Sequence, residues 1–430
     1  MATLKAVRGT RDLLPPETAL WNYVEATARA VFARYGFGEI RTPIFEDTAL
    51  FARGVGEETD IVSKEMYTWQ DRTRADSDSA QSLTLRPENT AGVVRAYIEH
   101  KLGDTGMLQK LFYIGPQFRR ERPQRGRYRQ FWQIGAEVLG PAWSGADSAL
   151  RDAEVLEMLA TFLNELGVKG WKLEVNSVGS STDRPKYIAA LRDALAPVKD
   201  KMSADNQRRA ETNPLRVLDS KDAGDQEIIN GLPKIADFLD DASKEHFAQV
   251  LAALDACGVA YTVNPRLVRG LDYYTRTTFE FTVPDGSGLG TQNALLGGGR
   301  YDGLSELLGG PKAPGIGFAI GEDRLILTLQ AQEAVAKERK LDAFVAPMGV
   351  ERNAAALALA QELRRAGLSV EVGDGSFRLK KSFEAADKLA RRMVIVGEDE
   401  VSSGILTVKD FSAGDQTKVP RAELAGFLRA

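Results

Sequence analysis

Alternating apolar and polar positions predict a β-hairpin in the first third of the chain. Residues 111–115 and 131–138 are rich in aromatic and β-branched side chains, and Pro123 and Gly126 interrupt the stretch between them. With a strand period of two, one face of the second segment carries Phe131, Gln133, Gly135 and Glu137, and the other carries Trp132, Ile134, Ala136 and Val138. The second face is apolar and belongs in a core. The first combines a flat ring, two polar groups and a glycine, which suits a pocket floor with room left above Gly135.

Upstream of the hairpin, residues 83–90 run from a strand into a helix that the apolar spacing predicts over 91–100. Thr90 is a candidate N-cap of this helix, and Glu88 is a candidate partner of the helix dipole. For these eight residues alone, helix capping is the simpler interpretation.

Downstream, residues 267–275 precede a strand predicted over 278–283, and a buried turn explains the two adjacent tyrosines of this segment about as well as ligand binding does. Two glycine-rich stretches, 297–303 and 314–321, are each consistent with a tight turn. The second lacks the spacing of a dinucleotide-binding fingerprint and closes no βαβ unit, which argues against a Rossmann domain.

The remaining segments indicate two further parts of the chain. Helical spacing dominates residues 184–258, which we interpret as a helical insertion in which His246 and Cys257 have no functional role. The charged stretch 331–340 is interpreted as a linker. Beyond it, strands are predicted at 343–346, 368–372, 393–397 and 405–408, and helices at 351–366, 379–391 and 421–429. This alternation predicts an α/β unit with a mostly parallel sheet.

Length and composition narrow the class of protein. The chain has 430 residues, of which 43% are hydrophobic and 27% charged, as in a globular protein of about three domains. A single cysteine allows no intrachain disulfide, and two histidines argue against a Cys/His zinc site, so we expect no protein-bound metal. No stretch has the length of a membrane span or the apolar core of a secretory signal, so we expect a soluble cytoplasmic protein without a membrane partner.

Charge is distributed unevenly along the chain. The net charge is −4, so any contact with nucleic acid must be local, yet residues 119–129 contain six arginines in eleven positions. Such a run is often a solvated loop, but this one joins the two strands of the hairpin, and Arg119 stands where the first strand ends. An arginine fork binds two phosphate oxygens at once, and Phe131 offers a ring for a planar base. The hairpin therefore predicts a pocket for a phosphate and a base.

Several motifs in a fixed order resemble class II aminoacyl-tRNA synthetases, and among them the histidyl-tRNA synthetase family. The similar segments are an N-terminal start at 8–12, motif 1 at 37–46 with Pro43, motif 2 at 112–137, the histidine signature Arg-Gly-Leu-Asp-Tyr-Tyr at 269–274, and motif 3 at 315–325. Residues 341–430 resemble the anticodon-binding domain of that family. The resemblance implies a catalytic core in residues 1–183 and 259–330, interrupted by the insertion 184–258 and followed by the linker 331–340.

The resemblance also implies a fold, a reaction and partners. The fold is α+β, with an antiparallel catalytic sheet flanked by helices, a helical insertion and a C-terminal α/β anticodon-binding domain. The reaction is the ATP-dependent attachment of L-histidine to tRNA(His) through histidyl-adenylate, with release of AMP and diphosphate. Mg²⁺ would accompany ATP, and a homodimer would form through motif 1 around Pro43.

The residues implied by the resemblance form two sets. The histidine set comprises Glu88, Thr90 and Gln133 at the α-amino group, Glu137 and Tyr274 at the imidazole with Tyr273 beside them, and Arg119 and Arg269. The ATP set comprises Arg119 at the α-phosphate, Glu121 near the nucleotide, Phe131 on adenine and Arg324 at the γ-phosphate, with Arg269 contacting both the α-phosphate and the histidine carboxylate. Arg119, Arg269 and Arg324 would be the catalytic groups, because this reaction needs charge neutralisation and positioning and no general base.

Two positions depart from the family pattern: Asn89 replaces a usual glycine and Trp132 a usual histidine. Asparagine tolerates unusual backbone angles and Trp132 lies on the core face, so we expect an intact site with an altered contact to the tRNA acceptor end. Two alternatives are an inactive paralogue, such as the regulatory subunit of ATP phosphoribosyltransferase, and a sensor of uncharged tRNA. The first lacks the C-terminal domain and degrades the motifs, and the second carries extra domains.

The C-terminal part also contains basic residues that could face RNA phosphates or simply form a solvated helix face. They are Arg378, Lys380, Lys381, Lys388, Arg391 and Arg392.

Overall fold

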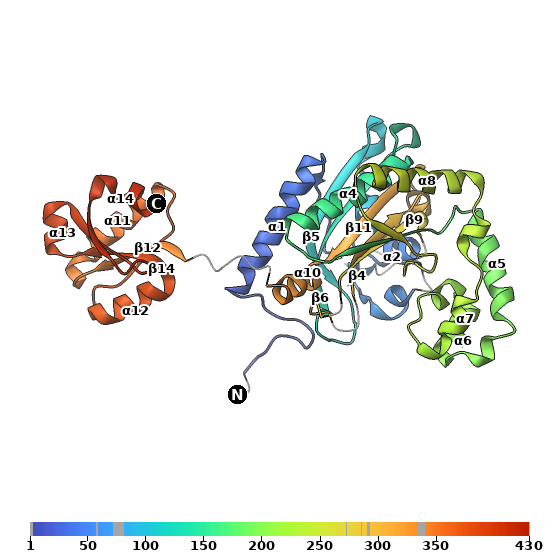
Figure 1. Ribbon diagram of the computed structural model, residues 1–430, viewed down its shortest axis with the longest axis horizontal. Helices are drawn as coiled ribbons and strands as arrows, with labels where there is room; N and C mark the ends of the chain where they lie inside the picture. The colour runs from blue at the N-terminus through green and yellow to red at the C-terminus, as the bar shows by residue number, and fades with distance from the viewer. Residues whose placement is uncertain are drawn as a thin grey trace. The chain divides into compact units, whose positions relative to one another are not determined.

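The computed structural model describes residues 3–56, 59–71, 81–271, 273–284, 286–289, 293–333 and 340–429. The chain forms two compact units, Met1–Val335 and Ala336–Ala430 (Figure 1). Most of the linker predicted at 331–340 falls outside the described residues. Within the described part of the chain, no helix has the length and apolar character needed to cross a membrane.

An eight-stranded sheet forms the centre of the first unit, in the order β1-β5-β6-β11-β10-β9-β7-β8. The strands are β1 (Gly38–Glu39), β5 (Gln109–Phe118), β6 (Gln130–Leu139), β7 (Lys172–Ser177), β8 (Tyr261–Val263), β9 (Thr275–Thr282), β10 (Ala294–Arg300) and β11 (Gly315–Gly321). The six inner strands are antiparallel, as predicted, whereas β1 and β8 pair in parallel with their neighbours at the two edges. A separate small sheet consists of β2 (Phe45–Asp47), β3 (Tyr67–Gln70) and β4 (Ser82–Leu85).

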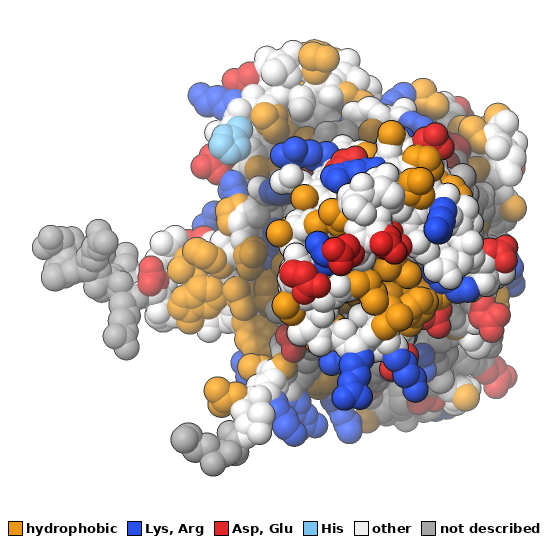
Figure 2. Space-filling model, turned by 90° about the vertical axis from the view of Figure 1, so that its left-hand side faces the viewer, with side chains coloured by type: hydrophobic (Ala, Val, Ile, Leu, Met, Phe, Trp, Pro, Cys, Tyr) orange, Lys and Arg blue, Asp and Glu red, His pale blue; other side chains and the backbone are white. Residues whose placement is uncertain are grey.

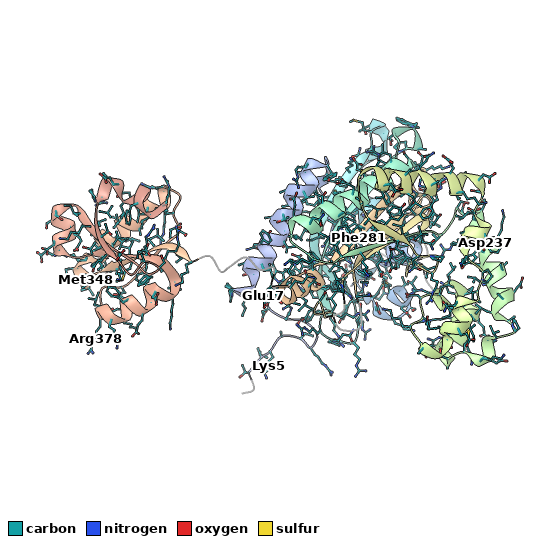
Figure 3. All side chains as sticks on the ribbon, in the orientation of Figure 1. Lys5, Glu17, Asp237, Phe281, Met348 and Arg378 are labelled. Atoms are coloured by element: carbon teal, nitrogen blue, oxygen red, sulfur yellow. The ribbon has the colours of Figure 1, made fainter. Side chains whose placement is uncertain are left out.

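The two faces of the large sheet are covered by different helices. One face packs against α1 (Glu17–Arg34), α4 (Ala149–Glu165), α8 (Asp241–Ala256) and α10 (Glu322–Ala331) (Figure 1). This main core contains Ile134, Ala136 and Val138, which confirms the face of β6 that the strand period assigned to the interior. Phe281 lies fully buried in the same layer (Figure 3). The other face carries α2 (Thr48–Val55), α3 (Thr90–Glu99) and α9 (Leu304–Leu307) over smaller apolar clusters.

Most of both glycine-rich stretches lies in strands, so their interpretation as tight turns is wrong except at residues 302–303, which form a turn. Residues 297–299 lie in the middle of β10, where the missing side chains allow close packing. A Cβ at Gly297 would lie 2.5 Å from the Arg269 guanidinium, and one at Gly299 would lie 2.8 Å from the Tyr274 ring. Gly298 likewise leaves no room for a side chain, since a Cβ there would lie 2.1 Å from the Gly317 carbonyl oxygen of β11.

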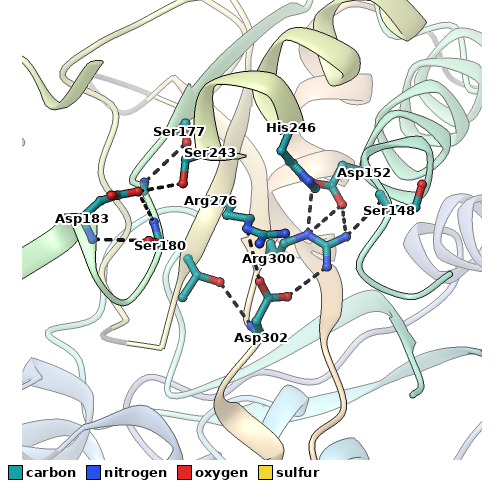
Figure 4. Close-up of polar contacts among 12 residues, drawn as sticks. Ser148, Asp152, Ser177, Ser180, Asp183, Ser243, His246, Arg276, Arg300 and Asp302 are labelled. Atoms are coloured by element: carbon teal, nitrogen blue, oxygen red, sulfur yellow. Dashed lines mark hydrogen bonds and ion pairs between the residues drawn. The ribbon is translucent and has the colours of Figure 1, made fainter. Parts of the chain in front are cut away.

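A buried ion network joins the sheet to two helices on its core face (Figure 4). The Arg300 guanidinium of β10 donates to the Asp152 carboxylate of α4, and both side chains are fully buried. His246 of α8 contacts the same carboxylate, with Nε2 2.8 Å from Oδ2. Burial opposes ionisation of Asp152, but Arg300 and His246 together bring its pKa below the usual value. His246 is therefore part of the internal packing, and Cys257 is exposed.

The insertion has an apolar core of its own. It contains α5 (Asp183–Leu195), α6 (Ala204–Thr212) and α7 (Gln226–Asn230), which lie together at one end of the first unit (Figure 1). Its core includes Tyr187, Leu215 and Ile229. Helix α8, by contrast, contributes Val250 and Leu254 to the main core. The boundaries 184–258 stay a prediction.

The second unit is a five-stranded sheet with helices, in the strand order β13-β12-β14-β15-β16. Its elements are β12 (Leu341–Pro347), α11 (Asn353–Arg365), β13 (Val370–Val372), α12 (Leu379–Leu389), β14 (Ala390–Val396), α13 (Glu398–Ser403), β15 (Ile405–Asp410), β16 (Gln416–Pro420) and α14 (Arg421–Arg429). The three strands β13, β12 and β14 pair in parallel, whereas β15 pairs antiparallel with both β14 and β16. The sheet is therefore mixed, and among the strands that the sequence predicts only β15 departs from the parallel arrangement. The prediction omitted β16 and α13.

Two of the six basic candidates of this unit are engaged in internal ion pairs. Arg391 contacts Asp342 at 2.9 Å and Arg392 contacts Asp410 at 2.8 Å. Arg378 projects from the surface (Figure 3), and the face of the unit seen in Figure 2 mixes basic, acidic and hydrophobic side chains. The internal pairs favour a structural role for Arg391 and Arg392.

Glu322, the first residue of α10, is a buried acid in the main core. Its side chain is fully buried, and within the described part of the chain neither carboxylate oxygen has a hydrogen-bond partner. Burial, with the nearby charges of Glu25 and Asp323, raises its pKa to about 9. The folded protein must therefore hold a proton at Glu322 that the unfolded chain releases above its ordinary pKa of 4.5.

Replacing Glu322 with glutamine should stabilise the first unit at neutral and alkaline pH. The stability cost of keeping Glu322 protonated grows as the pH rises from 4.5 toward 9, and at 1.36 kcal/mol per pH unit it reaches about 3 kcal/mol at pH 7. Urea unfolding of Glu322→Gln should thus show a gain at pH 8 that vanishes near pH 4.5. The exposed Glu306→Gln is the matched control, and an equal gain at both pH values would contradict the assignment.

Candidate active site

A cavity of about 270 Å³ lies on the face of the large sheet opposite the main core. Its floor includes residues of β9, β10 and β11, and its walls come from the start of α3, the β5–β6 hairpin, the segment before β9 and the start of α10. Ten of the eleven residues predicted from the sequence line it: Glu88, Thr90, Arg119, Glu121, Phe131, Gln133, Arg269, Tyr273, Tyr274 and Arg324. The eleventh, Glu137, lies beneath the wall and contacts two lining residues.

Glu88, and not Thr90, caps helix α3. The helix begins at Thr90, and the Glu88 carboxylate accepts the backbone N–H of Thr90 at 2.8 Å and of Ala91 at 3.0 Å. These bonds satisfy donors that a helix start leaves unpaired. The prediction of Thr90 as N-cap is wrong, because its hydroxyl donates to Glu137 instead. Burial raises the pKa of Glu88, although the two N–H groups oppose that rise.

Glu137 is a fully buried carboxyl held by two hydroxyl groups. Thr90 donates to Oε1 and Tyr301 donates to Oε2, each at 2.6 Å. Burial raises the pKa of Glu137 to about 8, and the two hydroxyl donors limit the rise. A Cβ at Gly317 would lie 1.7 Å from Oε2, so this carboxyl occupies space that the glycine leaves open.

Two lining residues, Tyr301 and Tyr113, were missed by the sequence analysis. Tyr301 belongs to a glycine-rich stretch that was interpreted as a turn. Tyr113 is paired with Gly135 across the hairpin, and a Cβ at Gly135 would lie 2.4 Å from the Tyr113 ring. The room expected above Gly135 is therefore filled by this ring. The predicted pocket face of β6 is otherwise confirmed.

Arg119 is oriented by the backbone and by an aromatic ring. Its Nε donates to the Pro87 carbonyl at 2.9 Å, and its guanidinium lies 5.2 Å from the centre of the Phe131 ring. Glu121 lies between two arginines, 3.8 Å from Arg119 and 3.6 Å from Arg127. A flat ring with an adjacent guanidinium is an arrangement that can bind a planar base and a phosphate together.

The other two predicted arginines, Arg269 and Arg324, also line the cavity. Arg269 Nη1 donates to Glu280 at 2.5 Å, and Glu280, which also lines the cavity, raises the pKa of Arg269 against the opposing effect of burial. Burial and the neighbouring charge of Arg127 lower the pKa of Arg324. Closely spaced cations in a partly buried cavity favour an anionic ligand with several charges.

The N-terminal segment 8–12 packs against the loop of the hairpin. Arg129 N–H donates to the Gly9 carbonyl at 2.7 Å, and Arg11 contacts Asp323 at 3.0 Å. Asp323 also accepts the backbone N–H of Trp132 at 3.2 Å. This segment thereby connects the hairpin with the start of α10. Asp272, within the predicted signature, lies outside the described residues.

Comparisons with known proteins agree with this geometry. Residues 9–325 match the histidyl-tRNA synthetase family, and residues 342–430 match the anticodon-binding-domain family. A protein of Koribacter versatilis named histidine--tRNA ligase is 68% identical over 427 residues, covering 99% of this chain and 96% of its own length. One of Solibacter usitatus with the same name is 52% identical and covers 99% of both. The structure of apo S. aureus histidyl-tRNA synthetase superposes with a TM-score of 0.81 at 37% identity, covering 100% of both chains.

Proposed function

The chain belongs to the histidyl-tRNA synthetase family, and we propose how the residues of its pocket divide the work of that reaction. The protein is a class II histidine–tRNA ligase that attaches L-histidine to tRNA(His) using ATP, through a histidyl-adenylate, with release of AMP and diphosphate. The observation that carries the assignment of roles is the convergence of separate chain segments on one cavity with a cationic end and an acidic end.

Three arginines serve the activation step. A carboxylate oxygen of histidine attacks the α-phosphorus of ATP, the bond from that phosphorus to the β-phosphate oxygen breaks, and diphosphate leaves. The nucleophile is already ionised, so the protein neutralises charge and aligns the reactants. Arg119 and Arg269 hold the α-phosphate and the histidine carboxylate, and Arg324 holds the γ-phosphate.

The nucleotide base lies on Phe131, with Glu121 near the nucleotide. The contact of Arg119 with the Phe131 ring supports this proposal. It places a guanidinium that can bind a phosphate and a ring that can stack on a base within the length of one nucleotide. The proximity of Arg324 to Arg127 supports an anionic ligand at that end of the cavity.

Histidine occupies the acidic end. Glu88, Thr90 and Gln133 surround its α-amino group, and Glu137 and Tyr274 contact its imidazole, with Tyr273 beside them. The buried Glu137 supports this arrangement, since a carboxylate accepts the ring N–H and its two hydroxyl donors fix its orientation. A site built around such a bond rejects amino acids that lack the donor.

Mg²⁺ accompanies ATP in this proposal. Within the described part of the chain, no group of three or more His, Cys, Asp or Glu side chains could hold a metal ion by itself. Mg²⁺ at nucleotide sites commonly takes one or two carboxylates and the phosphates, and Glu121 and Glu280 stand beside the proposed phosphate ligands. These residues fit the ion, which when bound neutralises β- and γ-phosphate charge.

We also propose a homodimer through motif 1 and a cytoplasmic location. Ile44 and Phe45 next to Pro43 are 45% and 54% exposed, and Trp69 lies 6.1 Å from the Phe45 ring, which forms an apolar surface on the small sheet. A chain with one cysteine suits a reducing compartment.

Replacing Arg269 with alanine should reduce ATP–diphosphate exchange to a small residual rate. Loss of one charged donor to the reacting phosphate typically costs about 10²–10³ in rate. Thermal unfolding and the oligomeric state of Arg269→Ala check that the fold is intact. Near-normal exchange in a folded variant would contradict the role of Arg269.

Histidine binding should release a proton in a pH-dependent way. Glu137, with a pKa of about 8, is protonated in most molecules at pH 7 and must lose that proton to accept an imidazole N–H. Calorimetry in buffers of different ionisation enthalpy should show the release of nearly one proton at pH 7, declining with a midpoint near pH 8. Release that stays constant between pH 7 and 9 would disprove the role of Glu137.

Replacing Phe45 with glutamate should dissociate the dimer. A charge at the centre of an apolar contact loses its hydration without a partner. Sedimentation at several concentrations should show monomers for Phe45→Glu and dimers for Leu357→Glu, a control at an exposed leucine of α11. If Phe45→Glu sediments as a dimer, the interface lies elsewhere.

A further inference from the structure

The segment that carries the histidine signature bridges two apolar cores. At its start, Val268 packs against the core of the insertion, which includes Leu215. At its end, Tyr273 and Tyr274 pack with Tyr301 beside the active-site cavity. The segment therefore lies between the insertion and the catalytic sheet, and contacts from either side determine its position.

Two arginines of the insertion hold the backbone of this segment. Arg216, in the short 3₁₀ helix Pro214–Val217, donates from Nη2 to the Gly270 carbonyl at 2.8 Å. Its guanidinium lies against Gly270, because a Cβ built there would be 3.4 Å from Nη1. Arg184, in α5, donates from Nη1 to the Tyr274 carbonyl at 3.2 Å. The two bonds are at opposite ends of the segment 270–274.

The residues at or next to these bonds include three that face histidine in the proposed function, among them Tyr273. Arg269 precedes Gly270 directly, and Tyr274 is itself one of the bonded residues. A small cavity of about 20 Å³ is lined by both arginines of the insertion together with Arg269 and Tyr274. The arginines that bond the backbone therefore lie directly beside two residues of the proposed site.

We propose that Arg184 and Arg216 are positioning residues for the activation of histidine. They act through the Gly270 and Tyr274 carbonyls on the side chains of Arg269, Tyr273 and Tyr274. Charged donors form stronger hydrogen bonds than neutral ones, and a displacement of about 1 Å in a reactive group can reduce the rate about 10²-fold. This inference rests on the proposed roles of Arg269 and Tyr274.

Steady-state exchange kinetics of Arg216→Met and Arg184→Met test the inference. Each variant should lower kcat/KM for histidine by about tenfold or more, because the histidine contacts lose alignment. The KM for ATP should change less, since Phe131 and Arg324 belong to other segments. Arg216→Lys, which keeps one charged donor, should restore most of the loss. Arg184→Met provides an independent measurement if Arg216→Met does not fold.

Arg266→Met is the matched control. Arg266 also joins the insertion to the core, donating to Asn230 at 2.7 Å and to Gln226 at 2.8 Å, but it touches neither carbonyl of the segment. The kcat/KM of this variant for histidine should stay within about twofold of the wild-type value, because Arg266 has no hydrogen bond or ion pair with the described residues of the site. An equal loss in Arg266→Met would overturn the inference, because docking of the insertion would then explain the effect.

A double variant separates this inference from the proposed function. If the arginine acts through Arg269, adding Arg216→Met to Arg269→Ala should cost much less than it costs the wild type. The inference would be overturned by full additivity, by equal increases in both KM values, or by normal kinetics of Arg216→Met and Arg184→Met. In each of these cases Arg269→Ala would still show only its residual rate. Near-normal activity of Arg269→Ala would instead refute the proposed function.

Discussion

Burial of ionisable side chains is the constraint on which the geometry of this protein depends. An unpaired charge in a protein interior costs several kcal/mol, so every buried carboxyl needs donors or a proton. Glu137 receives hydroxyl groups from α3 and from the residue after β10, and Asp152 receives Arg300 and His246 from two further elements. Each acid thus fixes the relative positions of segments far apart in the sequence. The proposed histidine end of the pocket depends on the first of these arrangements.

The sequence predicts the structure correctly where the strand period alone decides which side chains face the core. The strand period separated the core face of β6 from its pocket face, and Arg119 lies where its place at the end of a strand indicated. Cross-strand register could not be obtained this way: Tyr113 fills the space above Gly135 only because the two residues are paired in the hairpin. The sequence does not distinguish two ways of capping this helix. A threonine next to the helix start is a common N-cap, and the Glu88 carboxylate, two residues before the first helical residue, can accept the same backbone N–H groups.

Strand direction and ion pairing were likewise beyond the sequence pattern. The alternation of strands and helices correctly located most elements of the second unit, but β15 runs antiparallel to both of its neighbours. Strand β16 is largely exposed and lacks an apolar run. Arg391 and Arg392 look like candidates for RNA contact until their carboxylate partners, distant in sequence, are known. Most roles in the pocket came from family resemblance, since charge and spacing alone indicated only a phosphate and a base.

The glycines of β10 limit how this enzyme can change during evolution. Gly297, Gly298 and Gly299 are bare because Arg269, Phe279 and Tyr274 lie directly on the strand. Any substitution that adds a side chain at these positions would displace a neighbouring residue inside the sheet. Single substitutions at these glycines therefore cannot adapt the site to a different amino acid. A change of selectivity therefore has to come from pocket residues outside these three positions.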